Sequence, residues 1–222
     1  MSLETIEIET APNPLASVIV LHGLGADGND FVPVAEQLDL DDVGPVRFVF
    51  PHAPIRAVTI NGGARMRAWY DVLGFDLVKR EDEAGLRASQ AEIELLLARE
   101  RARGIPGSRT VTAGFSQGGA VTLQAGLRHD QRLAGLAALS SYLPLAATTA
   151  TERTAANSDV PIFFAHGRQD PMIAFARATA SRDALVALGY PLEWHEYDMG
   201  HSVCAEEIVH LNRWLSTVLA RR

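Results

Sequence analysis

Short runs of consecutive apolar residues recur along the chain and alternate with longer stretches of helical periodicity. The clearest runs are Val18–Leu21 and Ile162–Ala165. Uninterrupted runs of this length are typical of strands covered on both faces, as in a mainly parallel sheet. The pattern therefore predicts strands over Ser17–His22, Val46–Pro51, Arg109–Ala113, Gly135–Ser140, Pro161–His166 and Leu192–Asp198.

Three other segments have a different pattern. In Thr5–Thr10, isoleucines alternate with glutamates, which is typical of a strand with one solvated face, so we expect an exposed antiparallel edge strand. Pro51–Val72 contains several prolines and glycines, and Tyr142–Val160 is rich in Ser, Thr and Ala. Because apolar segments continue on either side of both, we expect these two stretches to be long loops within one domain.

Helical periodicity is clearest over Glu83–Arg103, where Leu86, Ile93, Leu96 and Leu97 fall on one side and the charges on the other. Strands that alternate with helices predict an α/β fold with a mainly parallel, doubly wound sheet. A chain of 222 residues fits a single domain, 1–222, without room for a large cap domain. The further predicted helices are Gln117–Arg128, Ala174–Leu188 and Ala205–Ala220.

Composition narrows the classes of function. The formal net charge of −7 disfavours binding to nucleic acid, because an acidic surface repels phosphate. A single cysteine excludes an internal disulfide. No apolar run reaches the roughly 20 residues of a membrane helix. The acidic N-terminal segment also lacks the basic start of a signal peptide, so we expect a cytoplasmic protein without a membrane span.

The strongest candidate for chemistry is Ser116, in the sequence Gly114-Phe-Ser-Gln-Gly118. This Gly-x-Ser-x-Gly pattern falls between a predicted strand and a predicted helix, the context that a nucleophile elbow requires. Small neighbours allow a tight turn there, and the following helix begins with N–H groups that favour negative charge. A glycine-rich turn with a helix-capping serine is the structural alternative, which the context disfavours.

A nucleophilic serine needs a base, and the base needs an orienting carboxylate. In this fold class the order along the chain is Ser, then Asp or Glu, then His. Asp170 and His201 each follow a predicted strand, so both lie at the same sheet edge as Ser116. We therefore predict a triad of Ser116, Asp170 and His201. The remaining histidines are weaker candidates: His52, His129 and His210 have no matching carboxylate in the pattern, and His166 and His195 belong to strands.

Acyl transfer also requires an oxyanion hole. One donor is expected to be the backbone N–H of Gln117, directly after the nucleophile. The other is expected to be the N–H of Leu24, in a glycine-rich loop after the strand Ser17–His22. The alternative for this loop is a flexible connection. We find no metal-ligand spacing and expect no metal. Cys204 is interpreted as a packed structural residue.

Six motifs occur in order along nearly the whole chain, and together they resemble the phospholipase/carboxylesterase family. That family includes bacterial carboxylesterases and eukaryotic acyl-protein thioesterases. The motifs are Leu21-His-Gly-Leu-Gly-Ala-Asp-Gly-Asn-Asp-Phe31, Pro51-His-Ala-Pro54, Ala68-Trp-Tyr-Asp71, Gly114-Phe-Ser-Gln-Gly-Gly119, His166-Gly-Arg-Gln-Asp-Pro-Met172 and Met199-Gly-His201.

The resemblance implies an α/β-hydrolase fold without a cap and ester cleavage without a cofactor. It implies the same triad and the same two oxyanion donors. It also implies that a homodimer can form. Finally, it suggests that the acyl pocket is lined by Trp69, Leu73, Met172 and Phe175.

The expected substrate is a small-molecule ester or thioester. The loop Gly25–Phe31 resembles the bacterial members, which favours a carboxylesterase acting on small or medium acyl groups. An acyl-protein thioesterase or a lysophospholipase with the same triad is the enzymatic alternative. A non-catalytic ligand-binding module is the alternative of another class, but no triad member is missing. A peptidase is disfavoured because no peptide-binding subsite is recognisable.

Overall fold

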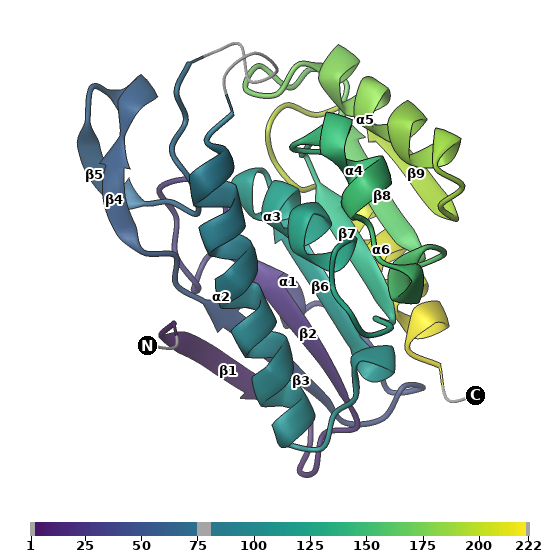
Figure 1. The fold of residues 1–222 in the computed structure, drawn as a ribbon. Helices are drawn as coiled ribbons and strands as arrows, with labels where there is room; N and C mark the ends of the chain where they lie inside the picture. Colours follow the sequence, from purple (N-terminus) through teal and green to yellow (C-terminus); the bar gives the residue numbers. More distant parts are fainter. Residues whose placement is uncertain (1–2, 75–80, 221–222) are drawn as a thin grey trace.

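The computed structural model describes residues 3–74 and 81–220, and a seven-stranded sheet forms its centre (Figure 1). The strand order is β1-β3-β2-β6-β7-β8-β9. β1 is antiparallel to β3, as predicted for the edge strand, and the other neighbouring pairs are parallel. The strands are β1 (Thr5–Glu9), β2 (Ala16–Leu21), β3 (Val46–Pro51), β6 (Thr110–Phe115), β7 (Gly135–Leu139), β8 (Ile162–Gly167) and β9 (Leu192–Tyr197).

Helices cover both faces of this sheet (Figure 1). One face carries α2 (Glu83–Ala102), α3 (Gln117–Gly126), α4 (Ala146–Glu152) and α5 (Phe175–Ala187). The other face carries the short α1 (Val32–Ala35) and α6 (Ala205–Val218). Two apolar clusters, one on each side, form the core. The predicted α/β architecture with a doubly wound sheet is therefore confirmed.

Helix α3 lies closest to the sheet. All its residues are buried, which agrees with its small, apolar sequence. At its end, a Cβ added to Gly126 would lie 2.2 Å from a methyl carbon of Leu136 on β7, so a larger residue would require Leu136 to shift. Close packing of α3 sets the position of the residue that precedes it, Ser116.

The prediction of long loops over Pro51–Val72 and Tyr142–Val160 is wrong. The first contains a two-stranded hairpin of β4 (Ile55–Val58) and β5 (Ala64–Arg67), and the second contains α4. The hairpin strands have four residues each and expose much of their surface, so they show little hydrophobic alternation. Helix α4 is an Ala/Thr segment of seven residues with only one buried side chain, so it has no apolar stripe to detect.

Candidate active site

Ser116 stands on a strained turn between β6 and α3, with φ of 55° and ψ of −117°. Non-glycine residues rarely adopt positive φ, and such strain persists only where the surroundings impose it. The neighbouring glycines explain how the turn fits. A Cβ on Gly114 would lie 2.3 Å from the backbone carbon of Gly118, and a Cβ on Gly118 would lie 2.2 Å from the carbonyl oxygen of Leu21. Strand and helix thus touch through their backbones, and the serine is raised at the sheet edge.

The structure brings Ser116, His201 and Asp170 together as a continuous hydrogen-bonded series. The Ser116 Oγ lies 2.9 Å from Nε2 of His201, and the Nδ1 of His201 lies 2.7 Å from Oδ2 of Asp170. Because a carboxylate only accepts, Nδ1–H donates to Asp170, which leaves Nε2 to accept from the serine hydroxyl. The three residues follow β6, β8 and β9, as expected for the carboxyl-end edge of a parallel sheet.

The Asp170 side chain is fully buried, and its orientation is set by its own turn. Its Oδ1 accepts from the backbone N–H groups of Met172 (2.8 Å) and Ile173 (2.9 Å). The neighbouring His166 ring lies with Nε2 2.9 Å from the Ile173 carbonyl oxygen and 3.5 Å from Asp170 Oδ2. Burial lowers the pKa of His166, so this ring is neutral and donates from Nε2. Because the two backbone N–H groups hold Oδ1, the other oxygen, Oδ2, faces His201, in the position that a base-orienting carboxylate needs.

The two expected oxyanion donors lie beside the nucleophile. Leu24 and Gln117 line the same cavity as Ser116 and His201, and Gln117 is the first residue of α3, at the positive end of the helix dipole. A Cβ on Gly23 would lie 3.5 Å from the Cβ of Ser116, which shows how closely the glycine-rich loop passes the serine.

His22 orients the Leu24 peptide. Its Nε2 accepts from the backbone N–H of Ala53 (3.0 Å), so its proton is on Nδ1, which donates to the Gly23 carbonyl oxygen (2.7 Å). The Gly23 carbonyl and the Leu24 N–H belong to one planar trans peptide and point in opposite directions. Burial is the main cause that lowers the pKa of His22, which keeps the ring neutral. Sequence reasoning missed this role of His22, although its place directly before the glycine-rich loop is a usable signal.

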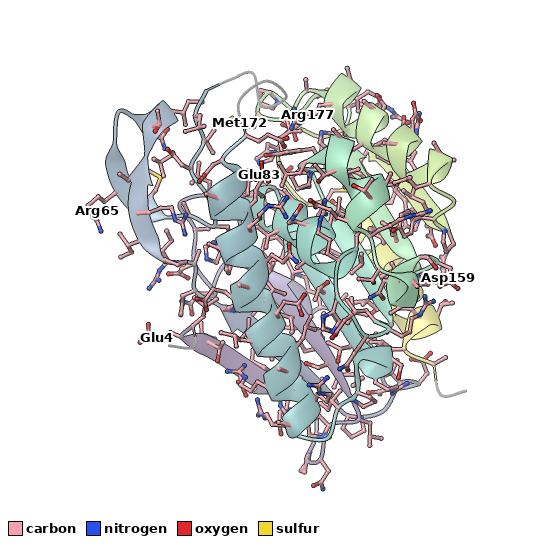
Figure 2. All side chains as sticks on the ribbon, in the orientation of Figure 1. Glu4, Arg65, Glu83, Asp159, Met172 and Arg177 are labelled. Carbon is pink, nitrogen blue, oxygen red and sulfur yellow. The ribbon has the colours of Figure 1, made fainter. Side chains whose placement is uncertain are left out.

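A cavity of about 600 Å³ opens over the triad. Of the four predicted pocket residues, Met172 lines it, and Figure 2 shows Met172 between the β4–β5 hairpin and α5. Trp69, Leu73 and Phe175 are not among the described residues that line it. The apolar side chains around the cavity are Leu24, Ile60, Met66, Val72, Phe115, Met172 and Ile173.

Side-chain direction explains why Trp69 and Phe175 do not line this cavity. Trp69 is fully buried, and its indole Nε1–H donates to the carbonyl oxygen of His22 instead of facing the cavity. Phe175 packs with its ring centroid 6.2 Å from the ring of Trp194. Sequence reasoning located the correct segment near Trp69, but Tyr70 and Val72 are the residues that face the cavity. Ile60 and Met66 were missed because the hairpin region was predicted to be a loop.

The expectation that His129 has no carboxylate partner is also wrong. Its Nδ1 lies 2.5 Å from Oε2 of Glu94, which joins the end of α3 to α2. Within residues 3–74 and 81–220, no group of three or more His, Cys, Asp or Glu side chains is arranged to hold a metal ion. In the same part of the chain, no helix combines the length and apolar character needed to cross a bilayer.

The sheet order, the two helical layers and the serine between β6 and α3 define an α/β-hydrolase fold. Residues 3–219 match the family model described as Phospholipase/Carboxylesterase. The chain belongs to this family, as its six motifs suggested, and is a hydrolase of carboxylic esters or thioesters.

Relatives and solved structures agree with this assignment. The acyl-protein thioesterase 1 of Neurospora crassa is 40% identical, with 93% of this chain and 88% of the relative covered. That of Mycosarcoma maydis is 41% identical, covering 93% and 92%. The crystal structure of Zea mays acyl-protein thioesterase 2 superposes with a TM-score of 0.87 at 28% identity, over 97% and 99% of the two chains. The Bacillus cereus carboxylesterase, at 18% identity and a TM-score of 0.76, covers 96% of this chain and 94% of its own, and shares the fold.

Proposed function

We propose that the protein cleaves acyl esters through a covalent acyl-enzyme on Ser116, with His201 as the base and Asp170 as its orienting carboxylate. The observation that carries the proposal is the series Ser116 Oγ–His201 Nε2, 2.9 Å, and His201 Nδ1–Asp170 Oδ2, 2.7 Å. These are hydrogen-bond distances at which a proton can pass from hydroxyl to imidazole.

In the acylation step, Ser116 Oγ attacks the carbonyl carbon of the ester while its proton passes to Nε2 of His201. Asp170 stabilises the imidazolium that forms. The carbonyl oxygen becomes an oxyanion that accepts from the N–H groups of Leu24 and Gln117. When the tetrahedral intermediate collapses, His201 returns the proton to the leaving alcohol or thiol, and the acyl group stays on Ser116.

Deacylation repeats the same chemistry with water. His201 takes a proton from water, the resulting hydroxide adds to the acyl carbon, and the proton returns to Ser116 Oγ as the carboxylic acid leaves. No step requires a cofactor. The chain's own groups thus supply nucleophile, base and oxyanion donors.

The cavity suggests acyl groups of small to medium length as substrates. Its lining is predominantly apolar, with a volume of about 600 Å³. Each buried methylene contributes about 0.8 kcal/mol of binding free energy while it stays within such a pocket. A second candidate function is hydrolysis of protein thioesters, which is favoured by the names of relatives that are 40% and 41% identical to this chain.

A matched series of acyl oxoesters and thioesters of increasing chain length distinguishes the two candidates. A carboxylesterase for small and medium acyl groups should lose kcat/KM beyond a few carbons and prefer oxoesters of simple alcohols. A thioesterase for long acyl chains should instead gain kcat/KM with each added methylene and keep its activity when the leaving group is a cysteine in a peptide.

Covalent labelling with a fluorophosphonate tests the proposal itself. We expect a single adduct on Ser116 in the folded protein, none after unfolding, and none in Ser116→Ala. Ser158→Ala, which removes an exposed serine, is the matched control and should label like the wild type. Folded wild-type protein without an adduct on Ser116 would contradict the triad assignment and support a ligand-binding module.

A cytoplasmic location and a homodimer stay predictions.

A further inference from the structure

The side chain of Gln117 has a function separate from that of its backbone N–H. It is buried against the segment that follows β5, and its Oε1 accepts from the backbone N–H of Trp69 at 2.8 Å. Its Nε2 donates to the carbonyl oxygen of Tyr70 at 2.7 Å. Both ends of the amide are used, so the first residue of α3 is tied to backbone groups of two consecutive residues, Trp69 and Tyr70.

Trp69 connects the same segment to the other oxyanion donor. Its indole Nε1–H donates to the carbonyl oxygen of His22 at 2.9 Å, and its ring lies 5.3 Å from the His22 ring. His22 is the residue whose Nδ1–H orients the Gly23–Leu24 peptide. The tryptophan thus holds, through its side chain, the base of the loop that carries Leu24.

The backbone adds a third connection. The N–H of Gly25, one residue past Leu24, donates to the carbonyl oxygen of Arg67 at 2.9 Å. A single segment, Arg67–Tyr70, therefore makes hydrogen bonds to two residues that follow β2, His22 and Gly25. It also makes hydrogen bonds to the side chain of Gln117 at the start of α3. The two donors come from residues 93 positions apart (117 − 24), and this segment bridges them.

We infer that Trp69 and the side chain of Gln117 are positioning residues that set the distance and angle between the two oxyanion donors. The inference rests on the proposed function, since it assigns the N–H groups of Leu24 and Gln117 to the oxyanion. Neither side chain touches the reacting atoms. Their contribution is made in the transition state, where the oxyanion accepts from both donors at once.

Hydrogen bonds that position the oxyanion donors affect kcat more than KM. An ester carbonyl in the ground state interacts weakly with the oxyanion donors, whereas the tetrahedral intermediate needs both. A displacement of about 1 Å in a positioned group can reduce the rate about 100-fold. Loss of either side-chain hydrogen bond should therefore lower kcat by about 10- to 100-fold with KM almost unchanged.

The test uses two variants and one matched control. Gln117→Met keeps the length of the side chain and removes both hydrogen bonds. Trp69→Phe removes the indole N–H and keeps an aromatic ring. Trp194→Phe is the control, because the indole N–H of Trp194 donates at 2.8 Å to Glu196 on the edge strand β9, away from Ser116. Thermal unfolding establishes that each variant is folded, and Gln117→Glu replaces Gln117→Met if the latter is not.

The deciding measurement is inhibition by a medium-chain alkyl trifluoromethyl ketone. Ser116 Oγ adds to its carbonyl carbon, the proton passes to His201, and the carbonyl oxygen becomes an oxyanion held by the two donors. We expect Ki to rise in Gln117→Met and Trp69→Phe by the same factor by which kcat/KM falls. Binding of the corresponding methyl ketone, which stays a trigonal ketone, should not change, and Trp194→Phe should match the wild type.

Two outcomes are distinguishable. If folded variants lose kcat while Ki for the trifluoromethyl ketone stays at the wild-type value, the positioning role is wrong and the loss has another origin. If the wild-type protein itself forms no adduct with the trifluoromethyl ketone, then the proposed function is wrong, and the positioning role with it.

Discussion

Asp170 at the active-site edge and Glu100 on α2 are both carboxylates with fully buried side chains, but their partners differ. Asp170 accepts from two backbone N–H groups and from His201. Glu100 contacts guanidinium groups, with Oε2 2.9 Å from Arg47 and Oε1 3.0 Å from Arg103. Arg47 in turn pairs with Glu9 at 2.9 Å and so joins the edge strand β1 to α2.

The difference separates a structural carboxylate from one suited to chemistry. An arginine is always charged, so the attraction between Glu100 and its guanidinium partners requires no proton transfer. In the proposed mechanism, His201, the partner of Asp170, gains a positive charge when it takes the proton of Ser116. Under this proposal the electrostatic attraction at Asp170 strengthens during the reaction, whereas the attraction at Glu100 is present without it.

The largest effect is expected for Asp170→Asn. The amide cannot stabilise the imidazolium and favours the wrong tautomer of His201, so kcat should fall by about 10⁴-fold, as in other serine triads. The unfolding free energy should change far less. Steady-state kinetics with an aryl ester, together with urea unfolding, measure both quantities. Retention of more than a tenth of the wild-type kcat would contradict the role of Asp170.

Glu100→Gln should show the opposite profile. It leaves Arg47 without its buried partner, and breaking a buried ion pair on one side costs about 3–5 kcal/mol of unfolding free energy. The folded fraction should keep its kcat. In urea unfolding, the double variant Arg47→Met with Glu100→Leu should recover part of the loss, because an apolar pair leaves no unpaired charge in the buried position. If Glu100→Gln alone had the unfolding free energy of the wild type, the structural role of Glu100 would be contradicted.

Glu207 extends the comparison to a buried carboxyl group that has no side-chain hydrogen-bond partner among the described residues. Burial raises the pKa of Glu207 to about 8, and the backbone N–H of Cys204 opposes this shift. The folded state therefore binds a proton that the unfolded state releases above about pH 4.5. The contribution of Glu207 to the unfolding free energy is fully present below pH 4.5. As the pH rises from there toward 8, the unfolding free energy falls by about 1.4 kcal/mol per pH unit.

Urea unfolding at about pH 5 and about pH 9 tests this expectation. The wild type should be less stable at the higher pH, and Glu207→Gln should lose most of that dependence because the amide does not ionise. A variant with the pH dependence of the wild type would show that another group is responsible.

The smallest effect is expected at the surface. Arg87 pairs with Glu83 and Glu152 at 2.7 and 2.8 Å, but it is largely solvated. Arg87→Met should therefore cost about 0.2–1 kcal/mol, and the difference should shrink further in about 1 M salt, where charges are screened within about 3 Å. Thermal unfolding at two salt concentrations measures it. A cost as large as that of Glu100→Gln would remove the distinction between buried and exposed pairs.

Much of the fold was predictable because its signals are local. The apolar runs of β2 and β8 indicated buried parallel strands, and the alternation in β1 indicated the edge. The hairpin β4–β5 and helix α4 were not predictable in this way. These elements are short and mostly exposed, so their sequences contain too little hydrophobic patterning to identify them.

The sequence by itself determined which residues meet at the sheet edge. Ser116, Asp170 and His201 each follow a strand of a parallel sheet, and parallel strands end at one edge, so chain order was sufficient. Tertiary structure alone decided which side chains face the cavity and which support it. Trp69 turns inward to His22, and Gln117 reaches Tyr70, because side-chain direction depends on contacts between segments far apart in the chain.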